Sequence, residues 1–334
     1  MKRFAGVSVA LGVVGLVAAF ALWALPAEEF IFTPGRAKPL AERVQVEGAR
    51  PVGAGDVYYV DVFVRRTSRL EDLLPFLRPE GSTVVPEQAL LPPGTSDAER
   101  DRQTAAEMAR SEVVASAVAL RALGYDLKAV PKGALVISVA PDVPAAAKVD
   151  AGDVIVAVDG KPVRSPDELR REIGDRKPGE DVELTVQRDG KTENVTVKTV
   201  PNPADPSRPI VGIRVDQEAD VELPIDIDID LGRVGGPSAG LPFALEIARM
   251  LGRDVTHGCK IAATGELALD GTVLSVGGLK QKTIGARKAG VDLFLVPAGE
   301  NTADARESAE DLEVVPVESF QQALRVLATS ERKC

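Results

Sequence analysis

The feature that most constrains this chain is an uncharged stretch of 22 residues near its N-terminus, Phe4 to Leu25. As a helix, this stretch would be about 33 Å long, enough to cross the hydrocarbon core of a bilayer. A lysine and an arginine precede it, and two glutamates follow it. Because positive flanks stay in the cytoplasm, we expect a single-pass anchor in the cell membrane over residues 1–28. Its N-terminus would be cytoplasmic, residues 4–25 would contact the membrane, and the rest of the chain would be extracytoplasmic.

The alternative for this segment is a cleaved signal peptide. The apolar run exceeds the usual core of such peptides, and Leu25-Pro26-Ala27 is a poor cleavage site, which favours the uncleaved anchor. Export would permit a disulfide. The sequence leaves open whether Cys259 and Cys334 are oxidised or free.

Composition excludes several classes of function. Forty basic and 50 acidic residues give a net charge of −10, and aromatic residues make up 4%, so no nucleic-acid partner is expected. With two cysteines and a single histidine, His257, a zinc site is not expected either. The alternating segment Ile225 to Asp230 presents an acidic face, but it lacks the spacing of a calcium loop and predicts a half-exposed strand. We expect no metal and no cofactor.

Residues 29–124 combine turn-rich sequence with three predicted elements. Val57 to Val64 alternates with period two and predicts a strand. Leu70 to Leu77 predicts a short helix, and the capping-box spacing at Ser96 opens a long helix that ends at Gly124.

Residues 125–200 form a compact pattern of short strands and one helix. Asp159-Gly160 and Asp189-Gly190 are hairpin signals, and Ser165 with Pro166 predicts a helix start. The segment resembles a PDZ domain of the bacterial protease-associated type. The resemblance is carried by Gly133-Ala134-Leu135-Val136, Ala140-Pro141, Pro144-Ala145-Ala146 and the run from Ala151 to Gly160.

That resemblance implies a peptide-binding groove between a sheet edge and a helix. The chain-end loop would be Gly124-Tyr125-Asp126-Leu127, and Leu169 and Ile173 would line the side-chain pocket. The alternative is that Leu169 and Ile173 are ordinary core residues. After this segment, the prolines of residues 201–206 predict a linker.

The chemistry is predicted in residues 231–290. A glycine-rich turn, Gly235 to Gly240, precedes an apolar helical run that begins at Leu241 and places Ser238 at a helix N-terminus. Backbone N–H groups at Ser238 and near Gly236 would stabilise a developing oxyanion. Phosphate sites share this pattern, so the turn alone does not decide the chemistry.

A nucleophilic serine needs a base. His257 lies in a polar turn, which favours a surface or capping role. Lys280 and Lys282 are two residues apart, so on a helix they face different ways and one of them can be buried toward Ser238. Burial lowers the pKa of a lysine and can leave a neutral amine.

Three separated motifs resemble the proteolytic domain of Lon-type Ser-Lys proteases in order and spacing. They are Gly236 to Gly240, Thr264-Gly265-Glu266 and Gly277 to Lys282. The resemblance assigns Ser238 as the nucleophile, Lys282 as the general base and Thr264 as the hydrogen-bond partner of the lysine.

Two departures from Lon itself narrow the resemblance. Gly235 stands where Lon has an acidic residue, and the Gly190-Lys191-Thr192 segment lacks the first glycine of a phosphate-binding loop, so no ATPase module is expected. The chain is most similar to the membrane-anchored, PDZ-containing Lon-like proteases.

The predicted fold is mixed α+β. It comprises a transmembrane helix (1–28), a region that helps to complete the protease fold (29–124), a small β-barrel-like PDZ domain with helices (125–200) and a Lon-type proteolytic α/β domain (201–334). The predicted function is an ATP-independent serine endopeptidase. Its expected substrates are unfolded proteins or chains with an exposed C-terminus. Its PDZ domain would recruit the substrate chain end or gate the protease. The resemblance also allows a homo-oligomeric ring. The alternative is a proteolytically inactive PDZ adaptor that binds peptide termini.

Overall fold

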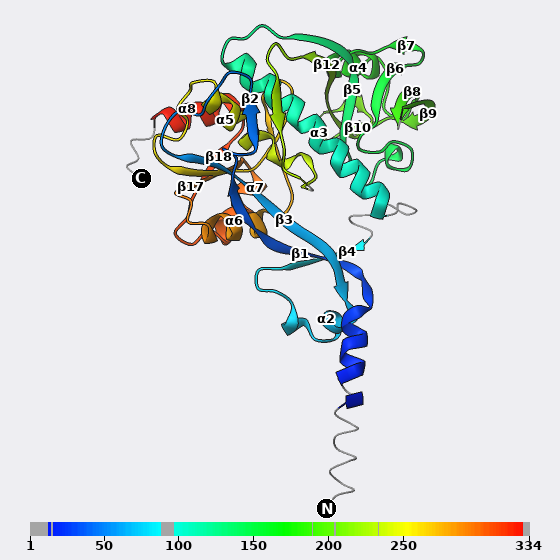
Figure 1. The fold of residues 1–334 in the computed structure, drawn as a ribbon. Helices are drawn as coiled ribbons and strands as arrows, with labels where there is room; N and C mark the ends of the chain where they lie inside the picture. The colour runs from blue at the N-terminus through cyan, green and yellow to red at the C-terminus, as the bar shows by residue number, and fades with distance from the viewer. Residues whose placement is uncertain are drawn as a thin grey trace, which may run out of the picture. The chain divides into compact units, whose positions relative to one another are not determined.

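The computed structural model describes residues 13–14, 16–87, 97–188, 190–203, 205–232 and 234–329 (Figure 1). The chain divides into two compact units. Unit 1 comprises Met1–Ala119, Ile225–Leu267 and Gly271–Cys334, and unit 2 comprises Leu120–Pro224 and Ala268–Asp270. In the sequence, unit 2 is therefore almost entirely an insertion into unit 1.

Unit 1 is built on a six-stranded sheet with the order β18-β17-β14-β3-β1-β4. β14 pairs in parallel with both β17 and β3, whereas β1 pairs antiparallel with both β3 and β4. The strands are β1 (Pro26–Pro39), β3 (Asp56–Ser68), β4 (Thr83–Pro86), β14 (Lys260–Ala263), β17 (Leu293–Pro297) and β18 (Glu313–Val317). Strands from the N-terminal third thus lie beside strands from the C-terminal third in one sheet.

Helices cover both faces of this sheet (Figure 1). α6 (Leu279–Lys288) and α7 (Glu300–Glu307) pack on the face that presents Val60 and Phe294. On the opposite face lie α5 (Gly240–Met250), which is buried along its whole length, and α8 (Phe320–Thr329). The remaining elements of the unit are β2 (Val44–Val46), α2 (Arg69–Leu73), η1 (Pro75–Leu77), α3 (Asp97–Ala122), β13 (Ile227–Ile229), η4 (Pro237–Ala239), β15 (Glu266–Leu267) and β16 (Val273–Leu274).

Residues 16–24 are helical and end where β1 begins. Most of their apolar side chains are exposed, among them Phe20 at 66% and Trp23 at 61%. Residues 1–12 and residue 15 of the predicted anchor lie outside the described residues. Within the part of the chain that the structure describes, no helix is long and apolar enough to cross a membrane.

Unit 2 is a small sheet with the strand order β12-β5-β6-β8-β9, flanked by one helix. The helix α4 (Pro166–Gly174) begins where the sequence predicts, because the Ser165 hydroxyl accepts a hydrogen bond from the Glu168 N–H at 3.2 Å. The Glu168 carboxylate binds the N–H of Arg164 rather than that of the cap residue itself. The other elements are β5 (Lys128–Val139), η3 (Pro144–Ala147), β6 (Val154–Val158), β7 (Lys161–Pro162), β8 (Asp181–Arg188), β9 (Lys191–Lys198), β10 (Val200–Asn202), β11 (Asp205–Ile210) and β12 (Ile213–Glu222).

The structure differs from the sequence prediction after residue 200. The segment predicted as a linker forms a hairpin, since β10 pairs antiparallel with β11. β12 then pairs with β5 from Ile213 opposite Val139 to Glu222 opposite Lys128. Ile213 and Val215 pack against the core of unit 2, so this strand completes the sheet. The predicted mixed α+β class is confirmed.

Candidate active site

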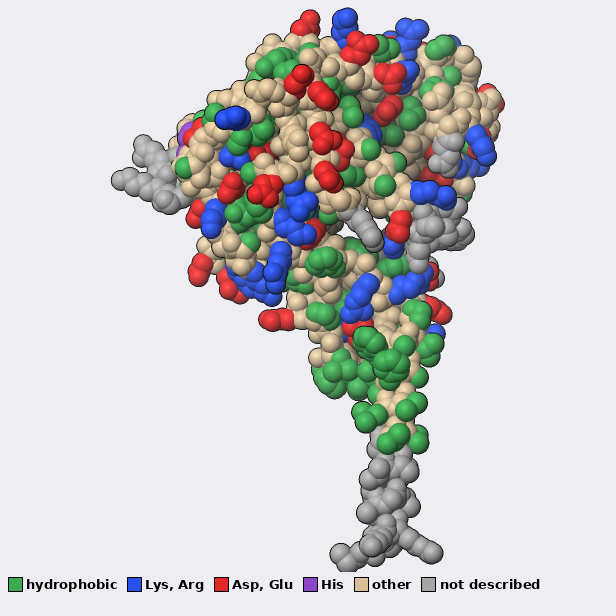
Figure 2. Space-filling model, in the orientation of Figure 1, with side chains coloured by type: hydrophobic (Ala, Val, Ile, Leu, Met, Phe, Trp, Pro, Cys, Tyr) green, Lys and Arg blue, Asp and Glu red, His purple; other side chains and the backbone are tan. Residues whose placement is uncertain are grey.

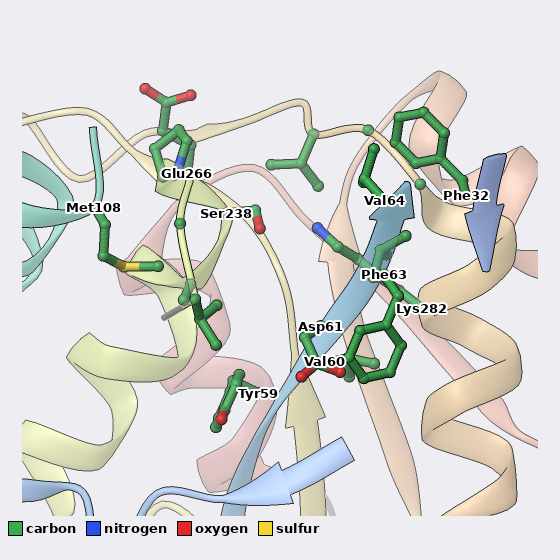
Figure 3. A pocket seen from close by; sticks show the side chains of 18 of the residues that line it. Phe32, Tyr59, Val60, Asp61, Phe63, Val64, Met108, Ser238, Glu266 and Lys282 are labelled. Carbon is green, nitrogen blue, oxygen red and sulfur yellow. The ribbon is translucent and has the colours of Figure 1, made fainter. Parts of the chain in front are cut away.

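Unit 1 contains a cavity of about 460 Å³ into which Ser238 and Lys282 both point (Figure 3). Its walls come from β1, β3, α3, the turn before α5 and the turn before α6. The lining residues are Phe32, Tyr59, Val60, Asp61, Val62, Phe63, Val64, Met108, Val234, Gly235, Pro237, Ser238, Ala239, Glu266, Ser275, Val276, Gly277, Gly278 and Lys282. Most of these side chains are apolar, and the polar ones are Asp61, Ser238, Glu266, Ser275 and Lys282.

The turn that carries Ser238 and the hydrogen bonds of its backbone fix the position of this residue. It lies in η4, just before α5, and the chain enters this turn through Gly236, whose φ of 88° is a left-handed conformation that favours glycine. The Ser238 carbonyl oxygen accepts hydrogen bonds from the Gly265 N–H at 2.9 Å and from the Thr264 hydroxyl at 3.2 Å. These bonds fix the backbone of the serine against residues 264–265.

Lys282 lies in the first turn of α6, whose N-cap residue is the left-handed Gly278. Its side chain is only 4% exposed, whereas that of Lys280 is exposed. The Lys282 amine donates a hydrogen bond to Thr264 Oγ1 at 3.1 Å and points toward Ser238 (Figure 3). The structure therefore brings Ser238, Thr264 and Lys282 together.

The environment of Lys282 favours its neutral form. Burial lowers its pKa from the usual 10.5 to about 7, because the charged amine loses hydration in the cavity wall. A carboxylate in contact with the amine would oppose this effect. Asp61 lines the same cavity, but its oxygens accept hydrogen bonds from Lys38 Nζ at 2.6 Å and from the Arg36 N–H at 3.1 Å. That carboxylate is already engaged by other donors.

Sequence reasoning missed Asp61 and the neighbouring residues of β3. The alternating pattern of residues 57–64 predicted the strand but gave no sign that it forms a wall of the site. The available signal was an acidic residue between apolar residues of one strand, and in the structure Asp61 is only 9% exposed.

The structure places the two predicted oxyanion donors in different environments. The Gly236 N–H donates a hydrogen bond to the Thr104 carbonyl of α3 at 2.8 Å, so in this conformation it is not free to bind an oxyanion. The Ser238 N–H lies at the start of η4 and α5, where N–H groups have no partner within the helix. Of the two predicted donors, the Ser238 N–H is the one at a helix start, and its oxyanion role stays a prediction.

His257 is not among the residues that line the cavity. It has a φ of 47° in a surface turn, and its N–H donates to Asp254 Oδ1 at 2.9 Å. This position agrees with the surface or capping role favoured by the sequence.

The predicted peptide-binding residues of unit 2 have two different environments. Gly124, Tyr125 and Asp126 are exposed and Leu127 is half-buried, immediately before β5. Leu169 and Ile173 are 2% and 6% exposed, respectively, and lie in the hydrophobic core of the unit. In this conformation they are core residues, the alternative that the sequence left open, and offer almost no surface to a peptide.

No described group of three or more His, Cys, Asp and Glu side chains is arranged to hold a metal ion.

Comparison with known proteins identifies two domains. Residues 121–199 match the PDZ domain family, and residues 213–330 match the C-terminal proteolytic domain of Lon protease (S16). The chain thus combines a PDZ domain with a Lon C-terminal proteolytic domain. The second match and the relatives below support a serine protease.

Similar proteins include two Lon proteases. That of Mesomycoplasma hyopneumoniae is 42% identical over 91 residues, which are 26% of this chain and 10% of the relative. That of Desulforamulus reducens is 39% identical over 111 residues, 32% of this chain and 12% of the relative. The matched part is thus about a tenth of the length of these curated relatives. Among solved structures, the PDZ domain of the SdrC-like protein from Listeria monocytogenes is 31% identical, with a TM-score of 0.25, over 26% of this chain and 92% of that chain.

Proposed function

We propose that this chain is an ATP-independent serine endopeptidase that uses a Ser238–Lys282 dyad and acts outside the cytoplasm on a membrane tether. The observation that carries the proposal is the buried amine of Lys282, which shares one cavity with the hydroxyl of Ser238 and is bonded to Thr264. A base of this kind must be neutral near pH 7, and the pKa of about 7 satisfies that need.

Thr264 determines how the amine is used. Its hydroxyl proton is donated to the Ser238 carbonyl, so toward Lys282 the threonine oxygen can only accept. A neutral Lys282 then spends one N–H on Thr264 and keeps its lone pair for the Ser238 hydroxyl proton. Ser238 Oγ attacks the scissile carbonyl as Lys282 takes its proton, and the same amine returns that proton to the leaving nitrogen.

The negative charge that develops on the substrate oxygen requires a donor that is already in place. The Ser238 N–H supplies it at the start of α5, where the helix dipole also favours negative charge. A second donor becomes available if the bond between Gly236 and Thr104 opens when substrate enters.

Several features support the tether and the compartment. The uncharged run from residue 4 to residue 25 and its flanking charges favour an anchor with the domains outside. Cys259 is disulfide-bonded, which fits an oxidising compartment. The glycine-poor segment before Lys191 supports ATP independence, because it does not fit a phosphate-binding loop.

The PDZ unit would act on peptide or protein chains, either by recruiting an exposed C-terminus or by gating access to the protease. The exposed loop from Gly124 to Asp126 supports recruitment. The pairing of β12 with β5 supports gating, since one edge of β5 already carries a strand of the same chain. Peptides with free and amidated C-termini distinguish the two, because equal affinity for both would exclude recruitment through the carboxylate. A homo-oligomeric ring, in which cleavage would be confined to unfolded chains, belongs to the same proposal.

The decisive test is product analysis. Full-length protein in detergent is incubated with a reduced, alkylated and therefore unfolded protein, without ATP, and the products are identified by mass spectrometry. We expect internal cleavage with the wild type and none with Ser238→Ala. Equal cleavage by the two proteins would assign the activity to a contaminant, and no cleavage by either would leave the adaptor alternative.

A further inference from the structure

A short turn of unit 1 presents large apolar side chains to the surface. This α2–η1 turn, residues 69–78, joins α2 to η1 and carries Leu73 at 66%, Phe76 at 79% and Leu77 at 46% exposure. Soluble proteins rarely expose such large apolar side chains together unless the patch binds another molecule or a membrane.

The α2–η1 turn is held in a defined conformation. Ser68 caps α2, and the Glu71 carboxylate accepts hydrogen bonds from the Ser68 N–H at 2.9 Å and from Arg65 at 2.9 Å. The bond from Arg65 and the bonds from Ser68 lower the pKa of Glu71 to about 2, so these contacts persist at neutral pH. The exposure of the apolar side chains is therefore a property of a capped and paired structure.

This apolar turn is continuous with the base of the N-terminal helix. The Arg69 N–H donates a hydrogen bond to the Leu25 carbonyl at 3.0 Å, and Pro26 of β1 pairs with Ser68. Phe20 and Trp23 are exposed on the helix just before this junction. Figure 2 shows hydrophobic side chains gathered over this end of unit 1, where the N-terminal helix leaves it.

We propose that the α2–η1 turn is a second membrane contact, which inserts Leu73, Phe76 and Leu77 into the bilayer interface beside the anchor. The proposal rests on the anchor described under the proposed function. A segment that emerges from a bilayer at Leu25 keeps a structure bonded to that residue within the interfacial region, where apolar and aromatic side chains are stable.

The neighbouring charges indicate how the turn would insert. The acidic residues beside it are paired with arginines, as in Arg65–Glu71, Arg66–Glu87 and Arg78–Asp72. Attraction to anionic lipid is therefore not needed, and burial of apolar surface is the driving force. We expect equal insertion into zwitterionic and anionic vesicles.

Tryptophan fluorescence tests the proposal, because Trp23 is the only tryptophan in the chain. Full-length protein is reconstituted into vesicles that contain brominated lipids, which quench indoles within the bilayer. Three proteins are compared: the wild type, W23F/F76W and W23F/Q321W. The last variant places the indole at an exposed position of α8, which lies in unit 1 away from the N-terminal helix (Figure 1). Retained peptidase activity and an unchanged circular dichroism spectrum show that each variant folds.

We expect bromolipid quenching of Trp23 and of the indole at position 76, a blue-shifted emission from position 76, and no quenching at position 321. Quenching of Trp23 without quenching at position 76 would overturn this inference and leave the anchor intact. Absence of quenching at Trp23 would instead contradict the anchor itself. A blue shift at position 76 that grows with protein concentration and resists bromolipid would assign the turn to contact between copies of the chain, and would also overturn the inference.

Discussion

The amine of Lys282 donates a hydrogen bond to the hydroxyl of Thr264 at 3.1 Å, and both side chains are buried. Thr264 in turn donates to the carbonyl of Ser238. One threonine thus links the side chain of the proposed base to the backbone of the proposed nucleophile.

Removal of either member of the dyad should abolish turnover. Lys282→Ala and Ser238→Ala should each lower kcat at least about a thousandfold, and the double variant should be no worse, because residues of one catalytic unit are not additive. Lys280→Ala is the matched control, since Lys280 is exposed on the same helix. Steady-state cleavage of a fluorogenic peptide measures all four variants, and full activity in Lys282→Ala would refute the assignment.

Thr264 should act through orientation. Thr264→Val keeps the shape but removes the hydroxyl, so kcat should fall about ten- to a hundredfold while KM changes little. Thr264→Ser restores the hydroxyl and should recover most of the rate. If valine and serine gave the same kcat, the hydroxyl would have no part in positioning Lys282.

The rate should follow the deprotonation of Lys282. Only the neutral amine accepts a proton, so kcat/KM should rise with pH through a midpoint near 7, the pKa of Lys282, and level off above it. A pH–rate profile of the wild type measures this midpoint. A rate that is constant from pH 5 to pH 9 would contradict a titrating base.

The lowered pKa of Lys282 also means that burial of its amine costs folding stability at low pH. The pKa of Lys282 is about 7 in the folded protein and near 10.5 in the unfolded chain, so between these values the unfolded state binds more protons and stability rises with pH. Lys282→Met removes the cost of burying the amine. Its melting temperature should exceed that of the wild type most below pH 7, and the difference should shrink toward pH 10. A difference that is independent of pH would show that packing, not charge, separates the two proteins.

Lys38 should keep the pKa of Lys282 low, because it pairs with the Asp61 carboxylate. Lys38→Met removes the cation that pairs with Asp61 at 2.6 Å, and the freed carboxylate in the same cavity would favour a charged Lys282. The midpoint of the pH–rate profile should move upward by about one unit. Lys280→Met removes a lysine from the surface of α6 and should leave the midpoint unchanged. An unshifted midpoint in Lys38→Met would mean that Asp61 does not act on Lys282.

Local patterns in the sequence predict local features of this structure. Ser165 and Pro166 mark the start of α4 because capping depends on neighbouring residues alone. The spacing of two residues between Lys280 and Lys282 was enough to expect that they face different ways, and the structure exposes the first and buries the second. The glycine-rich turn before α5 was likewise visible, because a φ of 88° at Gly236 strongly favours that residue type.

Features that depend on partners far away in the sequence could not be predicted from the sequence. The Gly236 N–H is taken by Thr104, and the Asp61 carboxylate by Lys38, and no periodicity reports such pairs. The pairing of β12 with β5 joins residues 213–222 to residues 128–139 across the whole PDZ unit, so a proline-rich stretch before it suggested only a linker. Leu169 and Ile173 show the same limit, since a helix face that meets the core and one that meets a peptide have the same pattern.

The parallel pairing of β3 with β14 has a consequence for how the protein is made. Asp56 lies opposite Lys260, and the PDZ unit is translated between them. A ribosome must therefore finish β14 before the central sheet can close, and α6 with Lys282 follows later still. A nascent or prematurely terminated chain that ends before α6 would carry the proposed nucleophile Ser238 without the proposed base, so we expect it to be inactive until Lys282 has been translated.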